Sequence, residues 1–149
     1  MRPRRWNPLW GAIFRLHAAL YRLSGGALGR RVYGMPVLML THRGARSGKL
    51  RQTPLCYCED GRNLAVIASN GGEPDHPAWY RNLMANPSAK VQVGHERRQV
   101  RARVADEAER ARIWERMASI YPGYRAYQAR TERRIPVVIL EPVAATSYC

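Results

Sequence analysis

The hydrophobic and polar positions of this chain alternate or cluster in six short segments that are typical of β-strands. In one of them, Val100, Ala102 and Val104 alternate with polar residues, so one face is buried and the other is wet. Asp60 and Gly61 stand between two such segments, and this pair is typical of a hairpin turn. The predicted strands are residues 37–41, 52–58, 64–69, 89–93, 99–104 and 135–140.

Helices are predicted from apolar residues at helical spacing and from capping signals. Residues 9–23 carry apolar side chains on one face and arginines on others. Pro77 opens a short helix that ends near Asn86, where a second proline prevents continuation. Asp106 and Glu109 form an N-capping pattern for a further helix. The apolar stripe of that helix consists of Ile113, Trp114, Met117, Ile120 and Tyr121.

The predicted strands are joined by hairpins or short helices, without a regular alternation of strand and helix. This order indicates the α+β class, with a six-stranded antiparallel sheet closed as a barrel and flanked by helices. We expect the barrel domain at residues 35–142, after an N-terminal amphipathic helix and linker at 1–34 and before a C-terminal tail at 143–149. The glycine-rich segment 25–29 follows a helix, so we interpret it as linker and not as a nucleotide-binding loop.

The formal net charge is +14, and nearly all positive charge is arginine, because Lys49 and Lys90 are the only lysines. Arginine binds phosphates and carboxylates through paired donors, although a GC-rich genome produces the same bias. Three cysteines and four scattered histidines provide neither a disulfide framework nor a four-ligand metal set. These features favour a reduced, metal-free cytoplasmic protein.

The predicted N-terminal helix is interrupted by Arg15, His17 and Arg22, so it matches neither a signal peptide nor a transmembrane helix. Its pattern leaves three interpretations open: packing on its own domain, peripheral contact with a membrane surface, and contact with a partner protein. Under the second interpretation the protein is cytoplasmic and membrane-associated.

Two glycine-bearing loops carry the strongest functional signal. Arg46 and Arg51 flank a Ser-Gly pair just before a strand, where amides and guanidinium groups can bind a phosphate; a solvated basic turn is the alternative. In the second loop, Gly71 and Gly72 allow close backbone approach to a ligand, and the helix that follows presents free amides. Trp79 on that helix either faces a flat ring system or belongs to the core.

Tyr121, Tyr124 and Tyr127 recur at every third residue, so their hydroxyls can share one face of a helical turn. Facing a cavity, they would orient a carbonyl or nitro group and relay a proton; a stripe of core tyrosines is the alternative. Cys56 and Cys58 share a strand face and are interpreted as buried thiols. Hydrolysis is not supported, because no histidine stands near a serine or cysteine in a nucleophilic pattern.

In combination and order, several motifs resemble the deazaflavin-dependent nitroreductase family over residues from about 35 to 142. They are Thr41-His42-Arg43-Gly44-Ala45-Arg46-Ser47-Gly48, Arg51-Gln52-Thr53-Pro54-Leu55, Ala68-Ser69-Asn70-Gly71-Gly72, His76-Pro77-Ala78-Trp79-Tyr80-Arg81-Asn82-Leu83, Tyr121-Pro122-x-Tyr124-x-x-Tyr127-Gln128 and Arg134-Ile135-Pro136-Val137-Val138. The resemblance implies a split β-barrel like that of pyridoxamine-phosphate oxidase and flavin-reductase-like proteins. It also implies an oxidoreductase that passes a hydride from reduced coenzyme F420 to a quinone, nitroaromatic or other conjugated acceptor, with FMN as the alternative cofactor.

The resemblance also implies roles for individual residues. The cofactor-binding set is Arg46, Ser47, Gly48, Arg51, Pro54, Ala68, Ser69, Asn70, Gly71 and Trp79. The catalytic set is Tyr121, Tyr124, Tyr127 and Ser69, with Tyr124 nearest the reacting ring and Cys56 on the substrate side. Ala45, Asn70 and Cys56 depart from residues common in the family, and Cys56 leaves the acceptor range open because a thiol is a weaker hydrogen-bonding group than a phenol.

Two other functions remain as alternatives. A barrel of this kind can carry a flavin or deazaflavin without its own catalysis. A basic nucleic-acid-binding module is less favoured, because the two loops suit a compact anion, and we expect no nucleic-acid partner. The expected partner is a small-molecule electron acceptor, and a monomer and a dimer both remain open.

Overall fold

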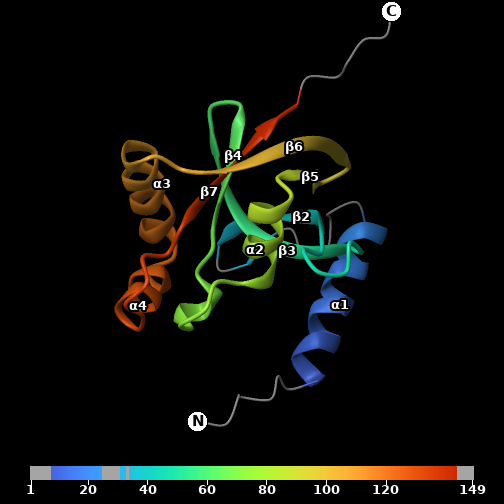
Figure 1. Cartoon of the computed structure of the whole chain (residues 1–149), viewed down its shortest axis with the longest axis horizontal. Helices are drawn as coiled ribbons and strands as arrows, with labels where there is room; N and C mark the ends of the chain where they lie inside the picture. The colour runs from blue at the N-terminus through green and yellow to red at the C-terminus, as the bar shows by residue number, and fades with distance from the viewer. Residues whose placement is uncertain (1–7, 25–30, 33, 144–149) are drawn as a thin grey trace, which may run out of the picture.

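The computed structural model describes residues 8–24, 31–32 and 34–143, and the predicted linker at 25–29 lies outside them. Its helices surround a small barrel of strands, as Figure 1 shows. The helical elements are α1 (Pro8–Leu23), η1 (Asn70–Gly72), α2 (Ala78–Ala85), α3 (Glu107–Ile120) and α4 (Gly123–Ala129). The strands are β1 (Arg31–Val32), β2 (Met35–Arg43), β3 (Leu50–Asp60), β4 (Asn63–Ile67), β5 (Ser88–Val93), β6 (Glu96–Val104) and β7 (Val137–Pro142).

Six of the strands form a closed antiparallel barrel in the order β2-β3-β4-β7-β6-β5, and β5 returns to pair with β2. The short strand β1 adds to β2. The β3–β4 hairpin turns at Gly61, with Asp60 paired to Asn63. The predicted α+β class, antiparallel barrel and hairpin are therefore confirmed.

Alternation along the strands divides the apolar side chains between the inside and the outside of the barrel. On β3, Tyr57 belongs to the interior cluster, whereas Cys56 and Cys58 pack against the helices outside. The interior cluster is Leu38, Leu40, Tyr57, Leu64, Val66, Ala68, Trp79, Leu83, Ala89, Val91, Val100, Ala102, Val138 and Leu140. Helices α3 and α4 cover a second cluster outside β3, β4 and β7. Helix α1 covers a third, with Ala18 and Tyr21 on Val37 and Met39 of β2.

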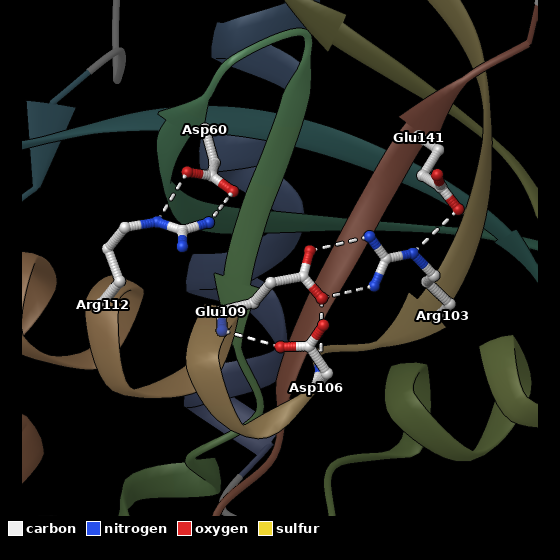
Figure 2. A network of polar contacts seen from close by, with 6 residues as sticks. All are labelled: Asp60, Arg103, Asp106, Glu109, Arg112 and Glu141. Atoms are coloured by element: carbon white, nitrogen blue, oxygen red, sulfur yellow. Dashed lines mark hydrogen bonds and ion pairs between the residues drawn. The ribbon is translucent and has the colours of Figure 1, made fainter.

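Helix α3 begins at the predicted capping box. The Asp106 carboxylate accepts a hydrogen bond from the Glu109 N–H at 2.8 Å, and the Glu109 carboxylate accepts one from the Asp106 N–H at 3.1 Å. Arg103 on β6 donates to Glu109 at 2.7 Å and to Glu141 on β7 at 2.9 Å, as Figure 2 shows. The Arg103 hydrogen bond holds the pKa of Glu109 at about 2. This network fixes the start of α3 against two barrel strands.

Some predicted boundaries differ from the structure. Strand β4 ends at Ile67, because Ser69 has helical backbone angles and caps η1. Strand β7 begins at Val137 and not at residue 135, because Pro136 has no N–H for the ladder. Ile120 was predicted in the buried stripe of α3 but is 49% exposed, and Tyr121 ends that helix.

Candidate active site

The cationic loop between β2 and β3 is shaped by its own backbone. The Gly44 N–H donates to the Lys49 carbonyl at 2.8 Å, and the Gly48 N–H donates to the Gly44 carbonyl at 2.9 Å. Gly48 has a left-handed φ of 68°, and a Cβ on Gly44 would lie 2.6 Å from the Ser47 hydroxyl. The Arg43 guanidinium donates to the Gly48 carbonyl at 2.6 Å, so this arginine stabilises the loop.

Arg46 lies on the surface of that loop, and Arg51 is the second residue of β3, just beyond it. Both side chains are exposed, and neither forms an ion pair with a carboxylate among the described residues. Both guanidinium groups are therefore exposed, and their binding of an anion stays a prediction. The loop and the start of β3 bring together the predicted Arg46, Ser47, Gly48 and Arg51.

A buried histidine connects the cationic loop to α2. The Asn82 side-chain oxygen accepts from the Ala45 N–H at 2.9 Å, so its NH₂ group faces His42 Nδ1 at 3.1 Å. Since Nδ1 accepts this bond, His42 donates from Nε2 to the Thr53 hydroxyl at 2.9 Å. Burial, and then the charge of Arg51, lower the pKa of His42 to about 4. The imidazole is thus neutral at physiological pH and keeps this arrangement.

The second glycine loop has a left-handed backbone at three successive residues. Asn70, Gly71 and Gly72 have φ values of 46°, 62° and 79°. The Asn70 side chain donates to the Asp75 carbonyl at 2.9 Å, which favours this conformation for a residue with a side chain. A Cβ on Gly72 would lie 2.7 Å from the Tyr127 carbonyl, so only glycine lets the loop meet α4 this closely.

The three predicted tyrosines meet at one place, although they lie on two elements. Tyr121 ends α3, whereas Tyr124 and Tyr127 belong to α4. The hydroxyls of Tyr121 and Tyr127 are 3.0 Å apart, and the three ring centroids are separated by 5.5 to 6.2 Å. Tyr124 is 6% exposed, and burial raises its pKa, so its hydroxyl stays protonated. Tyr124 thus matches the core alternative, and the action of the three hydroxyls on a substrate stays a prediction.

Cys56 lies between two of the clusters outside the barrel. It is half-buried on the outer face of β3 and packs at the edge of the clusters under α1 and under α3 and α4. Burial raises the pKa of its thiol to about 11, and it also raises the pKa of Cys58. Both thiols are therefore protonated at neutral pH, and Cys58 is buried as predicted, whereas Cys56 is only half-buried.

Four other residues were predicted for the site, namely Trp79, Ala68, Pro54 and Ser69. Trp79 is 7% exposed and Ala68 is fully buried, and both side chains belong to the barrel interior. For Trp79 this is the core alternative, and its contact with a cofactor stays a prediction. Pro54 is half-buried on β3, two residues before Cys56 on the same face. Ser69 lies at the start of the second loop.

Among the described residues, the cationic loop is connected to the tyrosines through α2 and the second glycine loop. Asn82 of α2 holds the cationic loop, and α2 follows the second loop directly along the chain. Gly72 of the second loop contacts Tyr127 of the tyrosine cluster. No group of three or more potential metal ligands occurs among the residues that the structure describes. Binding of an anion at the cationic loop and of a flat, polar molecule near the tyrosines stays a prediction.

Arg133 contributes to this site and was missed from the sequence. It donates to the carbonyls of Ser69 at 2.7 Å, Glu73 at 3.0 Å and Ala68 at 3.2 Å. Arg130 donates to the Gly71 carbonyl at 3.2 Å. No sequence signal separates Arg133 from the other arginines, because its role depends on a contact between segments more than sixty residues apart.

Comparisons with known proteins show the family of this chain. The family model described as F420H(2)-dependent quinone reductase matches residues 13–142. A Mycobacterium tuberculosis protein whose name describes an F420H(2)-dependent quinone reductase is 47% identical over 108 residues, 72% of this chain and 91% of that protein. Another protein of that organism, named F420H(2)-dependent quinone reductase, is 40% identical over 132 residues, 86% of this chain and 89% of its own length.

Solved structures show the same relationship. A structure titled as an F420-H2 dependent reductase has a TM-score of 0.65 at 42% identity, covering 71% of this chain and 94% of its own. A structure described as a domain-swapped dimer has a TM-score of 0.67 at 36% identity, covering 91% and 100%. A pyridoxamine 5'-phosphate oxidase from Listeria innocua, at 18% identity and a TM-score of 0.53 over 72% and 84%, shares the fold and confirms the split barrel.

Proposed function

This chain belongs to the F420H(2)-dependent quinone reductase family, and we propose that it holds coenzyme F420 between its two glycine loops and reduces a quinone beside the tyrosine cluster. The observation that carries the proposal is the pair of exposed arginines, Arg46 on the loop that Asn82 ties to α2 and Arg51 at the start of β3. Their position suits the phosphate and glutamyl tail of the cofactor. When bound, reduced F420 supplies the hydride.

The residues of this chain fit that cofactor. The cationic loop offers two guanidinium groups and the amides around Ser47 and Gly48 to anionic groups. The second loop offers backbone donors at Ser69, Asn70 and Gly71 for the polar edge of the ring system. Pro54 would lie beside the ring from β3, with Ala68 and Trp79 behind the second loop.

The tyrosine cluster would act on the acceptor. Because the pKa of Tyr124 is raised, its hydroxyl is a hydrogen-bond donor at neutral pH and can hold the oxygen of a quinone. The hydroxyls of Tyr121 and Tyr127 are hydrogen-bonded to each other, so one donates to the other and the pair could relay a proton towards the reduced acceptor. Cys56, whose thiol is protonated at neutral pH, would lie on the acceptor side of Tyr124. A nitroaromatic or another conjugated acceptor fits the same chemistry.

Binding experiments test the cofactor site. We expect the protein to bind F420 in preference to FMN, and Arg46→Ala or Arg51→Ala to weaken F420 binding by about tenfold or more, from a loss above ~1.4 kcal/mol. The control is Arg62→Ala, at an exposed arginine in the β3–β4 turn. Unchanged affinity in both loop variants, measured by deazaflavin fluorescence, would remove the phosphate site from this loop.

Helix α1 supports peripheral contact with a membrane surface. Its buried side, at Ala18 and Tyr21, packs on the barrel. Its outer side exposes Ile13, Leu16, Leu20 and Leu23, by 46%, 61%, 41% and 88%, and Arg15 and Arg22 are exposed beside them. An apolar stripe with basic neighbours suits an anionic lipid surface, where apolar quinones dissolve. In the described part of the chain, no helix is long and apolar enough to cross a membrane.

Vesicle flotation with phosphatidylglycerol tests this contact. The double substitution Leu16→Glu and Leu20→Glu should abolish flotation, because it places charge in the stripe without touching the barrel core. Equal flotation of both proteins would place any membrane contact elsewhere. The cytoplasmic location and the number of chains stay predictions, and light scattering would distinguish a monomer from a dimer like the domain-swapped relative.

A further inference from the structure

The carbonyl groups of the second glycine loop are gathered by one side chain. Arg133, in the segment between α4 and β7, donates to the carbonyls of Ala68, Ser69 and Glu73. Its guanidinium also lies 3.1 Å from His76 Nδ1, which accepts because an arginine can only donate. Four acceptors from one loop therefore converge on a single planar group.

Arg133 is itself held in place. The Gln128 side chain of α4 donates to the Arg133 carbonyl at 2.8 Å and accepts from the Ile135 N–H at 3.0 Å. The Arg133 N–H meets the Thr131 hydroxyl at 3.4 Å. Ile135 is fully buried, so the segment that carries the arginine is anchored to the core. These contacts fix the backbone of Arg133 and so the place from which its guanidinium extends.

The convergence of carbonyls on Arg133 determines where the amides point. In a trans peptide the C=O and the following N–H point in opposite directions, and the described peptide bonds include no cis bond. The N–H groups of Ser69 and Asn70 therefore point away from Arg133. The Asn70 carbonyl accepts from the Glu73 N–H, so the Gly71 N–H points away from that bond.

These amides form a set of free donors. In the described part of the chain, the N–H groups of Ser69, Asn70 and Gly71 have no hydrogen-bond acceptor. Ser69 has right-handed and Asn70 left-handed backbone angles, and this succession makes a concave cluster of amides that binds oxygen atoms. The ring of a deazaflavin carries carbonyl oxygens on one edge, which suits such a cluster.

We propose that Arg133 is a positioning residue for the cofactor ring, because it holds the second loop in the shape that presents the Ser69, Asn70 and Gly71 amides. This inference rests on the proposed function, since it assigns the ring, and not the tail, to the second loop. It separates two kinds of arginine in the site. Arg46 and Arg51 touch the anionic tail, whereas Arg133 acts only through backbone that it orders.

Two ligands and a matched pair of variants test the proposal. The ligands are F420 and the deazaflavin that lacks the phosphate and the glutamyl tail. Arg133→Met removes the guanidinium and keeps an apolar side chain of similar length. Arg134→Met is the control, because the neighbouring Arg134 is exposed and pairs only with Glu107, at 2.6 Å, among the described residues.

Arg133→Met should raise the Kd of both ligands by the same factor, about tenfold or more, whereas Arg46→Ala should raise it for F420 alone. Arg134→Met should change neither Kd by more than about twofold. A loss in Arg133→Met that is confined to F420, or is no larger than that in Arg134→Met, would overturn the proposal. In turnover, Arg133→Met should raise the KM for F420H2 and leave the KM for the quinone unchanged.

Arg133→Lys keeps the experiment decisive if the methionine variant does not fold. A lysine retains the charge but cannot reach several carbonyls at once, so binding of the tail-less ligand should still be weakened. Full recovery of binding by lysine would show that charge alone matters and would contradict the proposal. Hydrogen exchange without cofactor should increase at residues 68–76 and not elsewhere. If the wild-type protein bound neither ligand, the proposed function would fail, and the exchange pattern would still decide whether Arg133 holds the loop.

Discussion

The protonation of His42 gives a quantitative test of how the cationic loop is supported. The side chain is 4% exposed and lies between Asn82 and Thr53, with Nδ1 already used as an acceptor. Protonation of Nδ1 would place two donors against each other and add a charge beside Arg51. Burial, and then the charge of Arg51, lower the pKa of His42 from 6.5 to about 4. The perturbation in this test is therefore a decrease in pH, which protonates His42.

The lowered pKa means that the fold favours neutral His42. Its contribution to stability is complete above the unfolded pKa of 6.5 and is lost as the pH falls towards about 4. At about pH 5 the unfolded histidine is mostly protonated and the folded one is mostly neutral, so the free energy of unfolding should fall by about 2 kcal/mol relative to pH 7.5 from this group alone.

Urea unfolding, followed by tryptophan fluorescence, measures this loss at about pH 7.5 and about pH 5. The wild-type protein should lose about 2 kcal/mol more than His42→Gln over this interval, because glutamine does not titrate. The difference between the two proteins cancels the contribution of carboxylates such as Glu109. Equal losses, or an imidazole NMR titration of His42 near its ordinary pKa, would refute the reasoning.

Three further predictions concern the second loop, the tyrosines and α3. Gly72→Ala should destabilise the protein by about 1 to 3 kcal/mol in urea, since its Cβ would meet Tyr127 at a left-handed φ of 79°, whereas Gly71→Ala, with open space around it, should cost less. Tyr124→Phe should slow quinone reduction by about tenfold or more with little change in F420 affinity, and unaltered single-turnover rates would remove this hydroxyl from the reaction. Asp106→Ala should cost about 1 kcal/mol by loss of the capping box, and a change in F420 affinity in this variant would contradict its purely structural role.

Local signals predicted much of the fold. The Asp106–Glu109 capping box and the Asp60–Gly61 turn were correct because each depends on residues close together in the chain. The alternation of Val100 and Ala102 placed the buried face of β6 correctly, although Val104 at its end is 46% exposed. Such patterns are set by backbone periodicity and by short-range hydrogen bonds.

The support of the site could not be predicted in this way. His42 stood in a motif but had no role, because its partners Thr53 and Asn82 come from different elements. Arg133 depends on carbonyls more than sixty residues away and is one of many arginines. Every residue has a backbone carbonyl, so the sequence does not show which carbonyls an arginine binds. Residues that order a loop by binding carbonyls are therefore found only from the fold.

The central claim is that this protein transfers a hydride from F420H2 to a quinone, and single-turnover oxidation of bound F420H2 by menadione tests it most directly. We predict rapid return of the absorbance of oxidised F420 when menadione is added, with slower oxidation in Tyr124→Phe. Stable binding of F420H2 without oxidation by menadione would make the protein a carrier and would contradict the claim.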